Sequence, residues 1–276
     1  MQKIRPSDGY VLLVEDLVVD FPNNAIGSRV LHGICLSLKR GEILGLVGES
    51  GSGKSVFARS LVRLESPARI VSGSILLDSE ELTTKSQREM RQFRGKKISL
   101  VLQNPRSAMD PVFTMGNQFE EVISIHDARK NRKQWGKANV LQKVYELLQT
   151  VGIASPKERC RQYPHEWSLG MLQRALLVMA FSASPEVLLL DEVTSALDPT
   201  ISLQILDMII RLKEKEDTGI ILITHDLSIA FEVCDRVAVM QKGCIVETGT
   251  VREIFDKPVH PYTNLLIASI LEDVVC

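Results

Sequence analysis

The sequence contains no apolar run of about 18 residues, the length at which a segment becomes a candidate membrane span. Its longest apolar stretches, 175–181 and 187–190, fall well short of that length. The first twenty residues carry Lys3 and Arg5 but also acidic residues, and they contain no sustained apolar region ending in small residues. We therefore predict no transmembrane helix and no secretion signal, and we expect the chain to stay in the cytoplasm.

Cysteine pairs and an excess of one charge are also absent. None of the five cysteines forms a C-x-x-C pair, which argues against a disulfide framework and a zinc site. The formal net charge is −1, with acidic and basic residues interspersed, so we expect no nucleic-acid partner. With 45% hydrophobic residues, the chain of 276 residues can bury a large core. We expect free or buried thiols at Cys35, Cys160, Cys234, Cys244 and Cys276.

A complete phosphate loop is present, because residues 48–55 match G-x-x-x-x-G-K-S between a strand-like run and a helix-like run. Its glycines let the backbone curl around phosphate oxygens, and the amides at the following helix start direct positive charge to the same anion. Lys54 is expected to reach the β- and γ-phosphates, and Ser55 to ligate Mg²⁺. The predicted nucleotide-binding residues are Gly48, Glu49, Ser50, Gly51, Ser52, Gly53, Lys54 and Ser55.

Short apolar runs with turn signals surround the loop and predict an α/β chain with an antiparallel β flank. Residues 115–161 differ, because they are rich in polar and charged residues and contain an amphipathic helix that we expect to stop at Gly152. This pattern predicts a helical insertion. A charged helix is expected around 85–94. The strands are expected at 10–14, 17–21, 30–38, 42–47, 75–77, 98–102, 187–190 and 220–224.

Polar side chains follow two of the most apolar predicted strands. The strand 187–190 ends in Asp191 and Glu192, and the strand 220–224 ends in His225. Open α/β sheets bind ligands at the carboxyl edge of their strands, so these residues are expected near the phosphate loop. Asp191 is then a predicted Mg²⁺ ligand, and Glu192 is placed to polarise a water that attacks the γ-phosphate.

In this order, the motifs resemble those of ABC transporter ATP-binding subunits over essentially the whole chain. The resemblance implies a single ABC ATPase domain over 1–276. In it, 1–114 and 162–276 form a P-loop NTPase (RecA-like) core, and 115–161 form a helical subdomain that runs into the signature helix. It also implies ATP and Mg²⁺ as cofactors. The implied roles are the Q-loop glutamine and Mg²⁺ ligand for Gln103, the switch histidine for His225, the D-loop for Ser195 and Asp198, and adenine stacking for Phe21.

Two strings narrow the resemblance. The segment 103–111 is similar to the corresponding segment of importers for oligopeptides, dipeptides and nickel, and especially of the nickel and metal-chelate branch. The motif His260-Pro-Tyr-Thr263, in a C-terminal tail over 250–276, is also similar to a motif of these importers. This implies an ATP-hydrolysing motor subunit, peripheral on the cytoplasmic face of the membrane. The implied partners are two permease subunits, a second ABC ATPase subunit and an extracytoplasmic solute-binding protein. No iron-sulfur cluster is expected.

The signature segment departs from the family pattern. It comprises Ser168, Leu169, Gly170 and Met171, and the leucine stands where the family has a glycine. In the family this segment grips the ATP bound to the partner subunit. We expect the leucine to obstruct that approach or to disfavour the loop's backbone angles. The resulting hypothesis is an asymmetric heterodimer with one stronger hydrolytic site, and the alternatives are a non-transport ABC ATPase and a low-turnover regulatory subunit.

Overall fold

A six-stranded sheet forms the centre of the computed structural model, which describes residues 9–22, 28–131, 137–195 and 197–275. The strand order is β10-β9-β3-β8-β7-β6. Five strands run parallel, and β10 is antiparallel to its neighbour β9. The strands are β3 (Ile43–Val47), β6 (Ile98–Val101), β7 (Val187–Asp191), β8 (Gly219–Thr224), β9 (Arg236–Gln241) and β10 (Cys244–Thr250).

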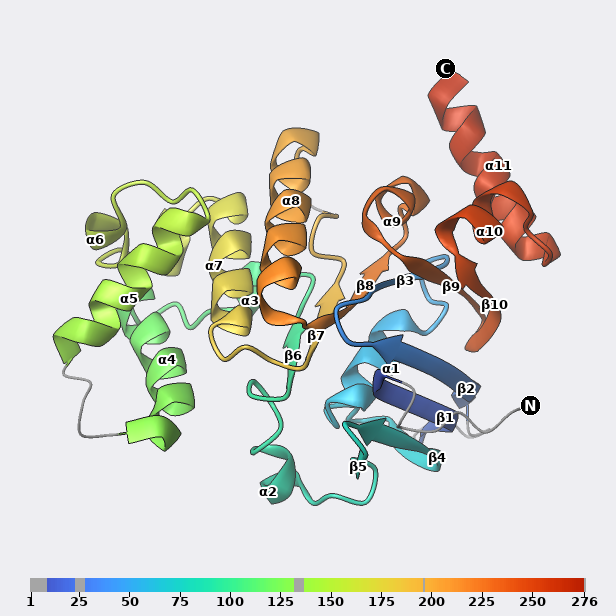
Figure 1. Cartoon of the computed structure of the whole chain (residues 1–276), viewed down its shortest axis with the longest axis horizontal. Coiled ribbons are helices and arrows are strands. Elements are labelled where there is room, and N and C mark those ends of the chain that lie inside the picture. The colour runs from blue at the N-terminus through green and yellow to red at the C-terminus, as the bar shows by residue number, and fades with distance from the viewer. Residues whose placement is uncertain (1–8, 23–27, 132–136, 196, 276) are drawn as a thin grey trace.

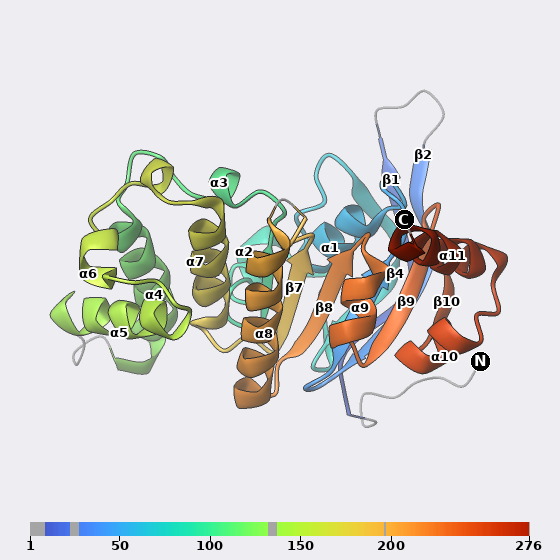
Figure 2. The same cartoon turned by 90° about the horizontal axis from the view of Figure 1, so that it is seen from above.

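Both faces of this sheet are covered by other elements, as expected for strands that are apolar on both sides. In β7, Val187 and Leu189 face one hydrophobic cluster, whereas Leu188 and Leu190 face another. The same alternation occurs in β8, because successive side chains of a strand point to opposite faces. The turned view shows α8 and α9 across one face of the sheet (Figure 2). The strands predicted at 187–190 and 220–224 are thus confirmed.

A second, antiparallel sheet covers the other face together with α1 (Lys54–Leu61). Its order is β2-β1-β4-β5, from β1 (Tyr10–Phe21), β2 (Ser28–Lys39), β4 (Arg69–Leu77) and β5 (Glu80–Glu81). The two strands predicted at 10–14 and 17–21 are wrong as separate elements. The chain bulges at Asp16, where φ is +47°, and keeps pairing with β2 and β4 on both sides of the bulge.

Helices also flank both ends of the six-stranded sheet (Figure 1). α4, α5 and α6 lie at the end away from the antiparallel sheet, while α10 and α11 lie near β10. The remaining bounds are α2 (Gln87–Met90), α3 (Pro105–Ala108), α4 (Met115–Asn131), α5 (Lys137–Thr150), α6 (Pro156–Arg159), α7 (Leu169–Phe181), α8 (Pro199–Glu216), α9 (Leu227–Val233), α10 (Val251–Asp256) and α11 (Pro261–Val275).

The helical region packs onto the sheet through one continuous core. Phe119 of α4, Val144 of α5 and Leu172 of α7 share a buried cluster with Leu188 of β7. Gly152 follows α5 with φ +73°, as expected for a helix stop. The division into a core and a subdomain over 115–161 stays a prediction.

Three other predictions can be compared with the fold. The charged helix expected at 85–94 is wrong in extent, because only Gln87–Met90 is helical, with a capping box at Ser86. Four of the five cysteines are free thiols, and Cys276 lies outside the described residues. Residues 1–8, where we predict no secretion signal, also lie outside the described residues. Among the described helices, none is both long and apolar enough to cross a membrane.

Candidate functional site

The phosphate loop joins β3 to α1, so the predicted strand, loop and helix are present in that order. Gly48 and Gly53 have φ values of +151° and +109°, which L side chains rarely adopt. A Cβ on Gly48 would lie 2.1 Å from the main-chain oxygen of Met240 on β9. Glycine at this position therefore lets the loop lie directly against the neighbouring strand.

Lys54 lies inside the curl of the loop and is only 4% exposed. Its Nζ donates to the carbonyl oxygens of Gly48 at 2.7 Å and Glu49 at 2.8 Å. Burial lowers the pKa of Lys54, while the nearby charges of Glu192 and Asp191 oppose that shift. The loop thus holds one buried cation within reach of its own backbone, which suits it to an anionic phosphate.

Asp191 and Ser55 bring two oxygen ligands together from different elements. Asp191 ends β7 and is 3% exposed, and Ser55 Oγ donates to its Oδ1 at 3.1 Å. Burial raises the pKa of Asp191, and the hydrogen bond from Ser55 opposes that shift.

The described residues contain no group of three or more His, Cys, Asp or Glu side chains that could hold a metal. The pair of Ser55 and Asp191 still fits Mg²⁺, because this ion usually takes one or two carboxylates and completes its shell with substrate phosphates and water.

Glu192 is held from two sides at the end of β7. Gln103, two residues after β6, donates from Nε2 to Glu192 Oε2 at 2.6 Å. His225, directly after β8, has its Nδ1 3.5 Å from Glu192 Oε1. Glu192 itself takes a φ of +50°, and its N–H donates to the Ile223 carbonyl at 3.0 Å. Three predicted site residues from three adjacent strands therefore meet at one carboxylate.

The predicted D-loop residues lie on the turn between Glu192 and α8. Ser195 Oγ donates to the Glu192 carbonyl oxygen at 3.0 Å, and it lies 3.5 Å from Gln103 Nε2. Asp198 caps α8 by accepting the Ile201 N–H at 3.0 Å. Ala196 between them lies outside the described residues. The turn is thus hydrogen-bonded to the group formed by Gln103, Glu192 and His225, which we call the Glu192 cluster.

The signature residues lie apart from this cluster, at the start of α7. Ser168 is the N-cap and accepts the Met171 N–H at 3.3 Å. In the described part of the chain, no hydrogen bond joins the signature to the phosphate loop. Gly170 is buried, and a Cβ there would lie 2.9 Å from Ile201 Cγ2 on α8. The second glycine of the signature is therefore required by packing within the chain.

The expectation that Leu169 disfavours the backbone of the signature is wrong. Leu169 is the first residue of α7 and does not have a positive φ. Any L-residue fits that conformation, because helical angles place no penalty on a Cβ. The expected steric effect of the leucine side chain on a partner's nucleotide remains a prediction.

Phe21 ends β1 and is half-buried against the cluster between the two sheets. It joins none of the contacts of the phosphate loop or the Glu192 cluster described above, and the following residues, 23–27, lie outside the described part of the chain. Adenine stacking by Phe21 stays a prediction.

Two residues from the C-terminal region contact the phosphate loop and were missed as site residues. Tyr262 Oη accepts the Glu49 N–H at 3.0 Å, and the Gly243 N–H donates to the Ser52 carbonyl at 2.8 Å. The sequence singles out Tyr262 within the motif His260–Thr263, but no spacing indicates a contact with a loop 213 residues away.

Comparison with known proteins adds an independent observation. A family profile described as ABC transporter matches residues 31–195. The probable peptide ABC transporter ATP-binding protein y4tR of Sinorhizobium fredii is 43% identical over 268 residues, which cover 96% of this chain and 78% of that protein. The oligopeptide transport ATP-binding protein OppD of Bacillus subtilis is 44% identical over 261 residues, 94% of this chain and 71% of OppD.

Solved structures give the same fold. The structure of cbiO1 from Clostridium perfringens, part of the ABC transporter complex cbiONQ, has a TM-score of 0.73 and 26% identity, and the match covers 98% of this chain and 100% of that one. A dimeric structure of MJ0796, a bacterial ABC transporter cassette, has a TM-score of 0.77 and 21% identity over 87% of this chain and 99% of that chain.

Proposed function

This chain belongs to the ABC transporter family, and from that premise we propose that it is the ATP-hydrolysing motor subunit of a peptide importer. Membership of this family supports ATP binding and ATP hydrolysis by this chain. The relatives whose names specify oligopeptide or dipeptide transport support peptides as the imported solute. Their names do not mention nickel or metal chelates, so peptides take precedence over the metal solutes suggested by the segment 103–111.

The observation that carries the proposal is the meeting of three strand ends at Glu192. Gln103 Nε2 donates to one carboxylate oxygen of Glu192, and His225 Nδ1 lies 3.5 Å from the other, next to the pair of Ser55 and Asp191. Phosphoryl transfer requires little covalent chemistry from the protein and depends on positioning and charge stabilisation. A water held by Glu192 between these groups would be aligned for attack on a γ-phosphate bound by the loop.

Each side chain then has a distinct task. Lys54 and the loop amides bind the phosphates of ATP, while Glu192 accepts a proton from the attacking water. Ser55, Asp191 and Gln103 would hold Mg²⁺, which would supply positive charge to stabilise the negative charge on the phosphates of ATP. His225 keeps Glu192 oriented and, as the family resemblance implies, contacts the γ-phosphate.

A second ABC ATPase subunit completes the site in this proposal. The signature at the start of α7 would serve the ATP bound to the partner, while the phosphate loop of this chain receives the partner's signature. Leu169 places a branched side chain at that first helical turn, where the helix start would face an anion. We therefore infer a heterodimer in which the site that uses this chain's phosphate loop hydrolyses ATP faster.

The asymmetry has a direct test in the assembled complex. Replacing Leu169→Gly removes the side chain without requiring a new backbone conformation, and it should raise turnover at the weaker site. Single-turnover measurements would separate the two sites. An unchanged rate at both sites would count against the role of Leu169.

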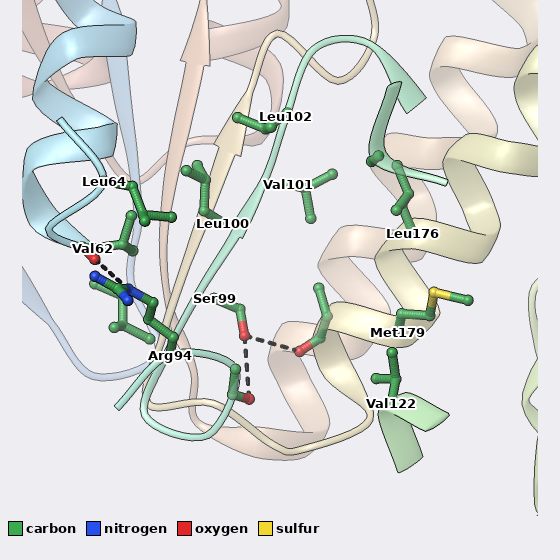
Figure 3. Close-up of a pocket in the computed structure, with 14 residues that line it drawn as sticks. Val62, Leu64, Arg94, Ser99, Leu100, Val101, Leu102, Val122, Leu176 and Met179 are labelled. Atoms are coloured by element: carbon green, nitrogen blue, oxygen red, sulfur yellow. Dashed lines mark hydrogen bonds between the residues drawn. The ribbon is translucent and has the colours of Figure 1, made fainter. Parts of the chain in front are cut away.

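An apolar groove supports coupling to a permease. It has a volume of about 370 Å³ and lies between the end of α1, β6, α4 and α7 (Figure 3). Leu102 lines it and directly precedes Gln103, so a permease segment seated here would move the residue that contacts Glu192. The apolar lining includes Leu64, Leu100, Leu102, Val122, Leu176 and Met179.

The partners in the proposal are two permease subunits, the second ATPase and an extracytoplasmic solute-binding protein. Attachment to the permease would hold the chain at the cytoplasmic face of the membrane. ATP binding would close the ATPase dimer, and hydrolysis with product release would open it. The groove would pass this motion to the permease.

Uptake measurements test the proposal. A strain that lacks this subunit should lose uptake of labelled dipeptide, and the wild-type gene should restore it while the Glu192→Gln variant should not. Loss of labelled nickel uptake with intact dipeptide uptake would replace peptides by a metal solute. Intact uptake of both, with ATPase activity in the purified chain, would instead favour a non-transport ATPase.

A further inference from the structure

The motif His260-Pro-Tyr-Thr263 lies against the phosphate loop, although it is far from it in sequence. Tyr262 Oη accepts the main-chain N–H of Glu49 at 3.0 Å, and Tyr262 is only 5% exposed. Burial raises the pKa of the Tyr262 phenol, so a neutral hydroxyl faces Glu49 at neutral pH. The carbonyl oxygen of the same Glu49 accepts from Lys54 Nζ at 2.8 Å. One residue of the loop thus links Tyr262 to the buried cation.

The ring of Tyr262 is fixed by its surroundings. It belongs to a buried cluster with Val47, which directly precedes Gly48, and with Leu227 at the start of α9. Leu227 lies two residues after His225. Tyr262 therefore packs in the same small core as Val47, which precedes the phosphate loop, and Leu227, which follows β8 and His225.

The segment that carries Tyr262 is itself anchored to β10. The Glu247 carboxylate accepts the Val259 N–H at 2.8 Å and the His260 N–H at 3.0 Å. His260 Nδ1 in turn accepts the Tyr262 N–H at 3.2 Å. These bonds restrict the backbone on the N-terminal side of Tyr262, so its hydroxyl has little freedom to leave Glu49.

The same region of the chain holds the loop at a second point. The turn between β9 and β10 places the Gly243 N–H 2.8 Å from the Ser52 carbonyl oxygen. A Cβ on Gly243 would lie 2.1 Å from the Val30 carbonyl oxygen, so this turn is closely packed. The C-terminal hairpin and helix therefore contact both halves of the loop, one through Gly243 and the other through Tyr262.

We propose that Tyr262 is a positioning residue that holds the Glu49 backbone in the conformation in which the loop binds ATP. The role extends to α11, because the start of this helix and Glu247 set the position of Tyr262. This inference rests on the phosphate loop being the ATP site. Tyr262 contacts no reacting atom, so it acts on ATP affinity and not on the chemical step.

The test uses Tyr262→Phe, which removes one oxygen and keeps the ring. Net hydrogen-bond contributions predict an ATP dissociation constant about 3- to 10-fold higher. The kcat at saturating ATP should stay close to wild type, and amide hydrogen exchange at Glu49 should become faster. Tyr145→Phe is the matched control, because Tyr145 is half-buried on α5 at the far end of the molecule.

A second variant separates positioning from simple packing. Glu247→Ala leaves Tyr262 intact but removes the acceptor for Val259 and His260. It should weaken ATP binding in the same direction, and the double variant should bind ATP more tightly than two independent losses predict. An unfolding midpoint near wild type for Tyr262→Phe would show that the fold is retained.

The outcomes distinguish this inference from the proposed function. If the wild-type protein binds ATP and Tyr262→Phe binds it equally well, with unchanged Glu49 exchange, the positioning role is overturned while the proposed function stands. Faster exchange with unchanged ATP affinity would also overturn it, since the contact would then have no effect on the nucleotide. A wild-type protein that binds no ATP would overturn the proposed function itself.

Discussion

Two glycines of the phosphate loop allow a quantitative test of how the loop is built. Gly48 and Gly51 both have positive φ values, +151° and +80°. A Cβ on Gly48 would lie 2.1 Å from the Met240 carbonyl oxygen, whereas a Cβ on Gly51 would meet no atom within 4 Å. Alanine at either position therefore strains the backbone, but only Gly48→Ala also forces the loop away from β9.

The expected magnitudes follow from these two terms. An L-residue in a left-handed conformation costs about 1–2 kcal/mol. A forced main-chain contact adds about 1–3 kcal/mol, as overpacking does elsewhere. We therefore expect the free energy of unfolding to fall by about 1–2 kcal/mol for Gly51→Ala and by about 2–5 kcal/mol for Gly48→Ala.

Thermal or urea unfolding without nucleotide measures both changes, because bound ATP would stabilise the folded state and obscure them. At about 3 °C per kcal/mol, the midpoint should fall by about 3–6 °C for Gly51→Ala and about 6–15 °C for Gly48→Ala. Equal losses for the two variants would refute the reasoning, since the contact with Met240 would then contribute nothing.

Two further substitutions and one labelling experiment have defined outcomes. Gly170→Ala should lower the free energy of unfolding by about 1–3 kcal/mol in urea titrations, because its Cβ would lie 2.9 Å from Ile201. Ser55→Ala should weaken ATP binding at least about tenfold with Mg²⁺ present and much less in EDTA, since it removes an oxygen beside Asp191. Burial raises the pKa of Cys160 to about 11 and leaves the side chain only 5% exposed, so iodoacetamide should label this thiol only after unfolding, as mass spectrometry would detect.

Much of the candidate site follows from local pattern, because its side chains lie in a glycine loop or within two residues of the end of an apolar strand. The parallel pairing of β7 with β8 then brings Glu192 next to His225 without further information. The bulge at Asp16 is different. It depends on β1 keeping two partners at once, and the turn residues within 10–21 indicate a break in the strand instead.

The contacts that the sequence does not predict join residues far apart in the chain. Nothing near Tyr262 signals that it lies against Glu49, because the contact depends on where the tertiary fold places the start of α11. The backbone of Leu169 is a similar case. A glycine in the family pattern suggests a special conformation, but the structure gives Leu169 ordinary helical angles, so the backbone at this position does not require glycine.

The most direct measurement is the steady-state ATP turnover of Glu192→Gln in the assembled complex, with ATP binding measured on the same sample. Because Glu192 is assigned as the base that accepts the proton of the attacking water, turnover should fall at least about 100-fold while ATP binding is retained. Glu121→Gln, exposed on α4, is the control and should turn over ATP like wild type. Turnover of Glu192→Gln near the wild-type rate would contradict the assignment of this site as the hydrolytic centre.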